Sequence, residues 1–86
     1  MPTLSVFYGI VIQMFWDDHP PPHFHATYAG EEPMIEIESS RVLQGHLPRR
    51  ALRFVLEWTE LHRDELMEAW DKCSTLTPPK RIAPLS

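Results

Sequence analysis

The sequence predicts an α+β fold, in which an antiparallel sheet of three or four strands is followed by a long or bent C-terminal helix. In the first half of the chain, apolar and polar residues alternate over short runs, which is typical of half-buried strands. After residue 48, apolar residues recur at helical spacing. Strands that come first and a helix that comes afterwards favour a segregated sheet and helix over alternating βαβ units.

The sheet is expected within residues 4–45. Strand character is found over 4–8, 10–16, 23–28, 34–38 and 41–45, of which the first and the last are short. The alternation in the third of these segments puts His23 and His25 on the same face of the strand. Three prolines in 17–22 remove three hydrogen-bond donors, so we expect a rigid connector there and not a strand.

The helix is expected from about residue 48 to residue 74, because no Pro or Gly interrupts 49–77 and because Pro48 suits the first helical position. A straight helix of this length would measure ~40 Å. A chain of this size is expected to be only ~30 Å across. We therefore expect the helix either to bend near residues 62–64 or to project from the body. Prolines make 75–86 an extended tail.

The composition indicates one folded globular domain, 1–86, with 43% hydrophobic residues and 23% charged residues of both signs. Cys73 is the only cysteine, which excludes an internal disulfide and a Cys-based zinc cluster and fits a reducing compartment. Neither a membrane span nor a signal peptide is predicted, so we expect a cytoplasmic protein with no membrane contact. The net charge of −4 argues against broad binding of nucleic acid but leaves room for a local basic patch.

One segment is distinctive enough to suggest a family. It reads Asp-Asp-His-Pro-Pro-Pro-His-Phe-His over 17–25, and it is accompanied by Leu-Pro-Arg-Arg-Ala-Leu over 47–52, Glu-Trp at 57–58, Leu-His-Arg at 61–63 and Ile-Ala-Pro-Leu at 82–85. The pattern resembles a family of short bacterial proteins catalogued only as a domain of unknown function. The resemblance implies a partner in a two-gene module similar to a toxin–antitoxin pair. It carries over no established catalytic residues.

Two histidines of this segment are candidate metal ligands. His23 and His25 are expected to point to one face of a strand about 6.7 Å apart, which suits two ligands of one zinc or other divalent ion. Extended prolines would hold His19 and His23 roughly 12 Å apart, so His19 is not expected to share the ion unless a prolyl bond is cis. The third ligand then comes from Asp17, Asp18, His46 or His62. Alternatively, the two histidines lie on a solvated or partner-contacting face and bind no metal.

The same segment is a candidate for acid–base catalysis. His19, His23 and His25 belong to the residue type that titrates near neutral pH, so a pair of them can deprotonate a ribose 2′-hydroxyl and protonate a leaving oxygen. Asp17 or Asp18 can orient His19 or raise its basicity. The alternative is that the run of Asp, His and Pro serves only as a loop.

Three arginines are candidates for binding an anion or a partner. Arg49, Arg50 and Arg53 fall in the first turns of the expected helix, where the helix dipole already contributes partial positive charge. That combination suits a phosphate or the carboxylates of a partner. The alternative is a surface salt-bridge network with Glu57, which accounts for Arg53 better than for the other two.

Two functions of different class follow. The first is an interaction or regulatory module that binds a small cognate protein. The second is a small histidine-dependent ribonuclease-like toxin or a metal-binding protein, with RNA as partner in the former case. Small size, acidic charge and an incomplete catalytic set favour the first. Two points are left open, namely whether the chain is an enzyme and whether it associates into a homo-oligomer.

Overall fold

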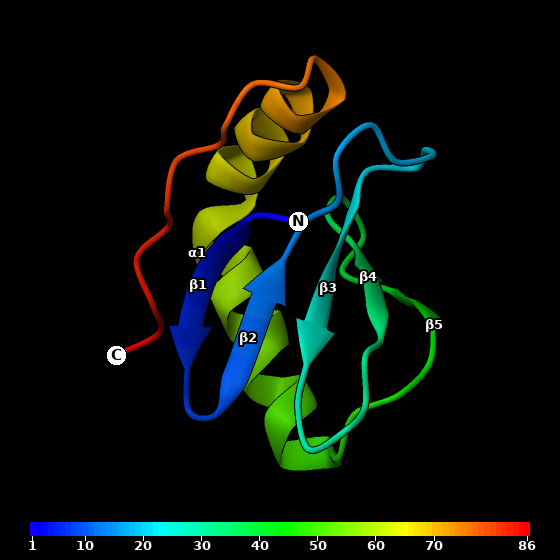
Figure 1. The fold of residues 1–86 in the computed structure, drawn as a ribbon. Helices are drawn as coiled ribbons and strands as arrows, with labels where there is room; N and C mark the ends of the chain where they lie inside the picture. The colour runs from blue at the N-terminus through cyan, green and yellow to red at the C-terminus, as the bar shows by residue number, and fades with distance from the viewer.

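The computed structural model describes all residues from 1 to 86 and has five strands and one helix. Their bounds are β1 Thr3–Phe7, β2 Ile10–Gln13, β3 His23–Thr27, β4 Met34–Glu36, β5 Val42–Gln44 and α1 Arg49–Ser74. The strands form one antiparallel sheet in the order β1-β2-β3-β4-β5, and α1 lies across it (Figure 1). The α+β class is confirmed. The sheet has five strands and not three or four, because both short outer segments pair with a neighbour.

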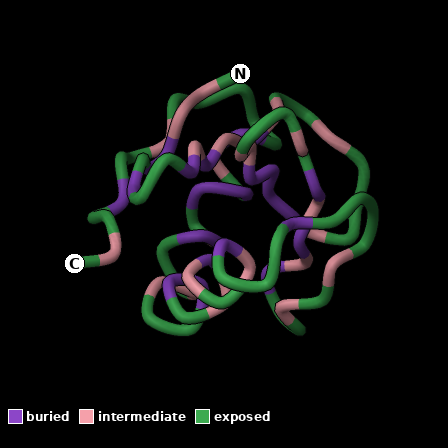
Figure 2. Tube along the Cα trace, turned by 90° about the horizontal axis from the view of Figure 1, so that it is seen from below, coloured by how far each residue is buried: buried purple, intermediate pink, exposed green.

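The core lies between the sheet and α1, as the buried parts of the trace in Figure 2 show. Trp58 is fully buried and packs edge-on against Phe24 of β3, with 5.8 Å between ring centroids. Leu4, Ile12 and Ile35 complete the same layer from the sheet side. Both tryptophans of α1, Trp58 and Trp70, belong to this core. No helix has both the length and the apolar character needed to cross a membrane.

The helix bends at His62, whose backbone angles of φ −125° and ψ 23° are not helical. A straight helix of 26 residues would be ~39 Å long, whereas the longest dimension of the molecule is 33 Å. The structure therefore adopts the bend and not the projecting end. Arg63, next to the bend, donates from Nε to the Ile37 carbonyl and from Nη2 to Ser40 Oγ, which ties the bend to the end of β4.

The C-terminal tail covers the outer edge of β1. The Ile82 N–H donates to the Leu4 carbonyl at 2.8 Å, and Trp58 Nε1 donates to the Ala83 carbonyl at 2.8 Å. Ile82 is buried, so the extended tail is part of the body. An edge strand that is covered in this way has fewer unpaired backbone groups to offer to another chain.

Most boundaries differ by one to three residues from the sequence-based expectation, and two of them lie beside the proline connector and the start of α1. The strand expected over 10–16 ends at Gln13, and Phe15 and Trp16 belong to the connector. Pro48 is the N-cap residue of α1 and not its first helical residue. Both differences arise where the chain must change direction, and sequence patterns locate such points less well than the elements themselves.

The two ends of the sheet are built differently. Tight two-residue turns close one end, with positive φ at Tyr8 and Gly9 and again at Ala29 and Gly30. These are the signs of type I′ hairpin turns. The start of α1 lies at this end (Figure 1). The proline connector, 14–22, lies at the opposite end, beside the second half of α1.

Candidate functional site

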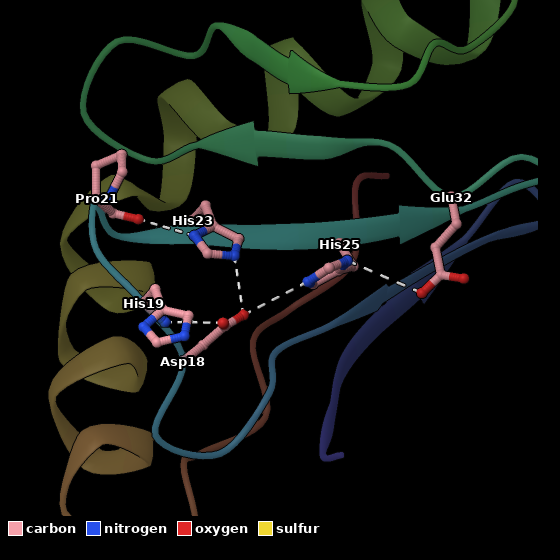
Figure 3. Close-up of polar contacts among 6 residues, drawn as sticks. All are labelled: Asp18, His19, Pro21, His23, His25 and Glu32. Atoms are coloured by element: carbon pink, nitrogen blue, oxygen red, sulfur yellow. Dashed lines mark hydrogen bonds and ion pairs between the residues drawn. The ribbon is translucent and has the colours of Figure 1, made fainter.

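The structure brings Asp18, His23 and His25 together. β3 directs both histidines to the same side, and the connector carries Asp18 across to meet them (Figure 3). Asp18 Oδ2 lies 2.9 Å from His23 Nε2 and 3.8 Å from His25 Nε2. One ligand atom from each residue lies within 4.8 Å of the other two. We call these three residues the histidine cluster.

The two histidines of the cluster are buried, and Asp18 is partly exposed. His23 is 3% exposed and His25 is 7% exposed. The Phe15 ring stacks on His25, with 4.1 Å between centroids and 8° between planes. Trp70 of α1 packs against His23 at 5.3 Å. The connector and the end of the helix therefore cover this part of the sheet, and the solvated alternative for the two histidines is wrong.

Each ring nitrogen of His23 lies within hydrogen-bond distance of an oxygen atom. Its Nδ1 lies 2.8 Å from the Pro21 carbonyl oxygen, which can only accept, so Nδ1 carries a proton. Its Nε2 faces the Asp18 carboxylate at 2.9 Å. Both ring nitrogens of His23 therefore face acceptors, and a proton on Nε2 would be donated to the Asp18 carboxylate. A metal ion at Nε2 would take the place of that second proton. The N–H to a backbone carbonyl is the usual outer contact of a metal-bound histidine.

His25 differs from His23, because its Nε2 is buried and has no hydrogen-bond partner. Burial lowers the pKa of His25, and the nearby His23 charge lowers it further, against the opposing pull of Glu32 and Asp18. The neutral imidazole therefore prevails at neutral pH, with a ring nitrogen available as a ligand. Its Nδ1 lies 3.8 Å from Glu32 Oε1, so that carboxylate can orient the ring.

Asp18 is held in its ionised form. Burial raises the pKa of its carboxyl, but the His19 backbone N–H and the neighbouring His23 and His25 outweigh that effect and bring the pKa below its ordinary value. The N–H of His19 donates to Asp18 Oδ1 at 2.8 Å, which leaves Oδ2 for the two histidines. The Asp17 N–H donates to the Cys73 carbonyl and thereby anchors this loop to the end of α1.

The donor set and its spacing fit a divalent ion. In a tetrahedral zinc site with bonds near 2.0–2.1 Å, ligand atoms lie about 3.3 Å apart. The two distances from Asp18 Oδ2, 2.9 and 3.8 Å, bracket that value. Two imidazoles and one carboxylate are ligands of zinc and of other first-row metals, and three protein ligands leave a coordination position open.

Other candidates for the site lie elsewhere. His19 is exposed and its ring does not belong to the cluster, although the Pro20–Pro21 peptide bond is cis. The expectation that Asp17 or Asp18 would orient the His19 ring is not met, because Asp18 faces His23 and His25 instead. His46 and His62 face Glu31 and Glu65, respectively. Of the four residues considered as third ligand, only Asp18 joins the two histidines.

The three arginines lie at the other end of the sheet, on the exposed start of α1. None of Arg49, Arg50 and Arg53 forms an ion pair, and the first turn contains no acidic residue. The alternative that paired Arg53 with Glu57 is therefore not found. Arg50 lies over the Phe54 ring, with 5.6 Å from its guanidinium carbon to the centroid.

Sequence reasoning missed the residues that support the cluster. Phe15, Trp70 and the Pro21 carbonyl come from segments with no strand pairing to predict them. Glu32 could have been found, because a two-residue turn at 29–30 places it across from Thr27, on the face of the two histidines.

Comparison with known proteins identifies the family of the chain. Residues 9–71 match the family described as "Domain of unknown function (DUF4160)", and the chain belongs to it. The matched range contains the whole histidine cluster. No curated protein and no solved structure matches the chain. The family is thus established, and its description assigns no activity.

Proposed function

We propose that the protein binds a divalent transition metal, with zinc as the first choice, through Asp18, His23 and His25. One observation carries the proposal, namely that His25 Nε2 is buried without a partner while it lies 3.8 Å from the Asp18 carboxylate. A buried polar atom without a hydrogen bond costs about 1–3 kcal/mol. An ion between these atoms removes that cost and replaces one proton on His23.

The site supports binding over catalysis. The five pockets of the structure are lined by other residues, so the cluster does not open into a cavity that would hold a sizeable substrate. When bound, the ion supplies a positive charge that joins the connector to β3. Asp18 and the two histidines hold it, and Pro21 and Glu32 orient the histidine rings. The fourth coordination position is available to water or to a donor from a partner.

Native mass spectrometry of the purified chain tests the proposal. We expect one zinc ion for each chain after loading and none after treatment with a chelator. His25→Ala should abolish retention of the ion, whereas His19→Ala, which changes an exposed histidine in the same segment, should leave it intact. Equal retention by the wild type and by His25→Ala would refute the site.

We propose a second function, because one specific observation favours it: α1 begins with three exposed arginines that form no ion pair, and one of them, Arg50, lines an apolar pocket. This arrangement supports an interaction module that binds a small cognate protein in a toxin–antitoxin-like pair. Co-expression with the product of the neighbouring gene should give a complex that survives purification. Growth arrest by the chain alone that His23→Ala relieves would instead support the ribonuclease-like toxin.

A further inference from the structure

We propose that the pocket at the hairpin-turn end binds an acidic segment of a partner protein, which inserts one aromatic or apolar side chain. A carboxylate of the segment would meet Arg50 at the rim of the pocket. The inference rests on the second proposed function and names the surface and the chemistry that this function would use. The metal site at the opposite end of the sheet plays no part in it.

The pocket has a volume of about 400 Å³, which lies within the usual range for ligand sites. It is lined by Tyr8, Tyr28, Pro48, Arg50, Ala51 and Phe54. The rings of Tyr8 and Phe54 contact each other, with 4.8 Å between centroids. An aromatic wall with a cation at its rim suits an apolar side chain that is followed by a carboxylate.

Tyr8 provides an independent reason to regard this surface as functional. It occupies the first position of a two-residue turn with φ 49°, a position that favours Asn, Asp or Gly. A bulky residue in this conformation is strained. The residue is also 53% exposed, so burial contributes little to offset that strain. A strained and exposed aromatic residue that borders a pocket is better explained by a contact with a ligand than by folding.

The charges select the occupant. Arg50, the arginine that lines the pocket, forms no ion pair within the chain, so a carboxylate from outside would be its first. The chain as a whole has a net charge of −4, which would repel a long polyanion such as RNA beyond the immediate patch. A short acidic peptide segment can place its negative charge beside Arg50 without extending over the acidic remainder of the surface. It can also fill the aromatic pocket.

Peptide titration of the full ¹⁵N-labelled chain, followed by NMR, tests the inference. The probe is a capped peptide of sequence Asp-Glu-Phe-Glu-Asp. Its two controls replace the central Phe by Ala or all four acids by Lys. We expect shifts of the Tyr8, Arg50 and Phe54 amides with the probe, binding about tenfold weaker with the Ala peptide, and no binding with the Lys peptide. Binding should also weaken as salt is raised.

Three variants separate binding from folding. Arg50→Gln should weaken the probe about tenfold, the loss expected for one charge-assisted contact. Arg81→Gln makes the same change of charge beside the second half of α1 and should have no effect. Tyr8→Asn relieves the strained turn, so the melting temperature should stay within about 3 °C of the wild type or rise. Its affinity for the probe should nevertheless fall.

The outcomes also distinguish this inference from the function on which it rests. If a cognate protein binds the chain and its affinity is unchanged by Tyr8→Asn and Arg50→Gln, the interaction module is supported but the pocket is refuted as its binding site. Shifts at the pocket that are produced by single-stranded RNA and not by the acidic probe would overturn the peptide as occupant. Probe shifts that spread evenly over all arginines and ignore the central Phe would mean general charge attraction, and they would also overturn it.

Discussion

The two ends of this sheet treat charge in opposite ways. At the connector end, Asp18, His23 and His25 are largely removed from water and crowd within 4.8 Å of one another. At the turn end, Arg49, Arg50 and Arg53 are exposed to solvent and form no ion pair. Because the groups at the connector end are largely buried, their protonation states affect the free energy of folding. Because the arginines at the turn end are exposed, they contribute little to it.

The difference teaches how to tell a ligand site from a docking surface in a small domain. A buried cluster with one unpartnered nitrogen is incomplete by itself, and a small ion completes it. An exposed basic patch is already satisfied by water, and only a partner that brings both negative charge and apolar surface gains from it. Mutations should therefore affect stability and binding together at the connector end and separately at the turn end.

The largest expected effect is on metal affinity. Asp18→Asn removes a charged ligand, and we expect zinc to bind more than about 100-fold more weakly, since even the outer contacts of metal ligands are worth 10–100-fold. Zinc at a free concentration about 100 times its dissociation constant should stabilise the wild type by about 2.7 kcal/mol. That corresponds to a rise of about 10–20 °C in melting temperature. Thermal unfolding with zinc and with a chelator checks both expectations.

An Asp18→Asn variant that zinc stabilises as much as it does the wild type would contradict the assignment. Asp17→Asn is the matched control, because it makes the same change one residue away and the Asp17 side chain lies outside the cluster. Its response to zinc should equal that of the wild type.

A smaller effect is expected from pH in the metal-free protein. His23, Asp18 and Glu32 face His25, and its pKa in the folded state lies below the ordinary value of 6.5. Between these two pKa values the unfolded chain binds more protons, so stability is full above pH 6.5 and falls as the pH decreases below it. Asp18 adds a further loss below pH 3.8, because its folded pKa is also lowered.

Denaturant unfolding at pH 7.5 and pH 5 measures this slope. His25→Gln should make the slope shallower, whereas His46→Gln, which changes an exposed histidine at the other end, should leave it unchanged. Stability that increases from pH 7.5 to pH 5 in the metal-free wild type would show that the buried histidine prefers the charged form. Zinc binding should weaken over the same range, since a ligating histidine must be neutral.

The smallest effect is expected at the turn end. Arg49 and Arg50 oppose the helix dipole by about 0.3–1 kcal/mol each. The double variant Arg49→Glu with Arg50→Glu should therefore keep or raise the melting temperature, while binding of the cognate protein weakens in a salt-dependent way. Differential scanning calorimetry and a binding titration at two salt concentrations check the two parts. A clear loss of stability with unchanged binding would return both arginines to a structural role.

Part of the fold was accessible without coordinates. The alternation of strands and the spacing of helices predicted a sheet before residue 45 and a helix from about residue 48. Because a straight helix would be longer than the expected diameter of the protein, the helix had either to bend or to project. The structure shows the bend, at His62. The number of strands was not accessible, because β5 has only three residues and pairs through a shifted register. Short edge strands leave too little alternation to be counted with certainty.

By itself, the sequence determined that His23 and His25 share one face of a strand, because successive side chains of a strand alternate. It also determined that the arginines begin the helix. Only the tertiary structure decided that Asp18 is the third member of the cluster, that Phe15 and Trp70 cover it, and that Tyr8 meets Phe54. Local spacing defines directions within one element. Contacts between elements depend on how the connector folds back and where the helix bends, and these follow from packing over the whole chain.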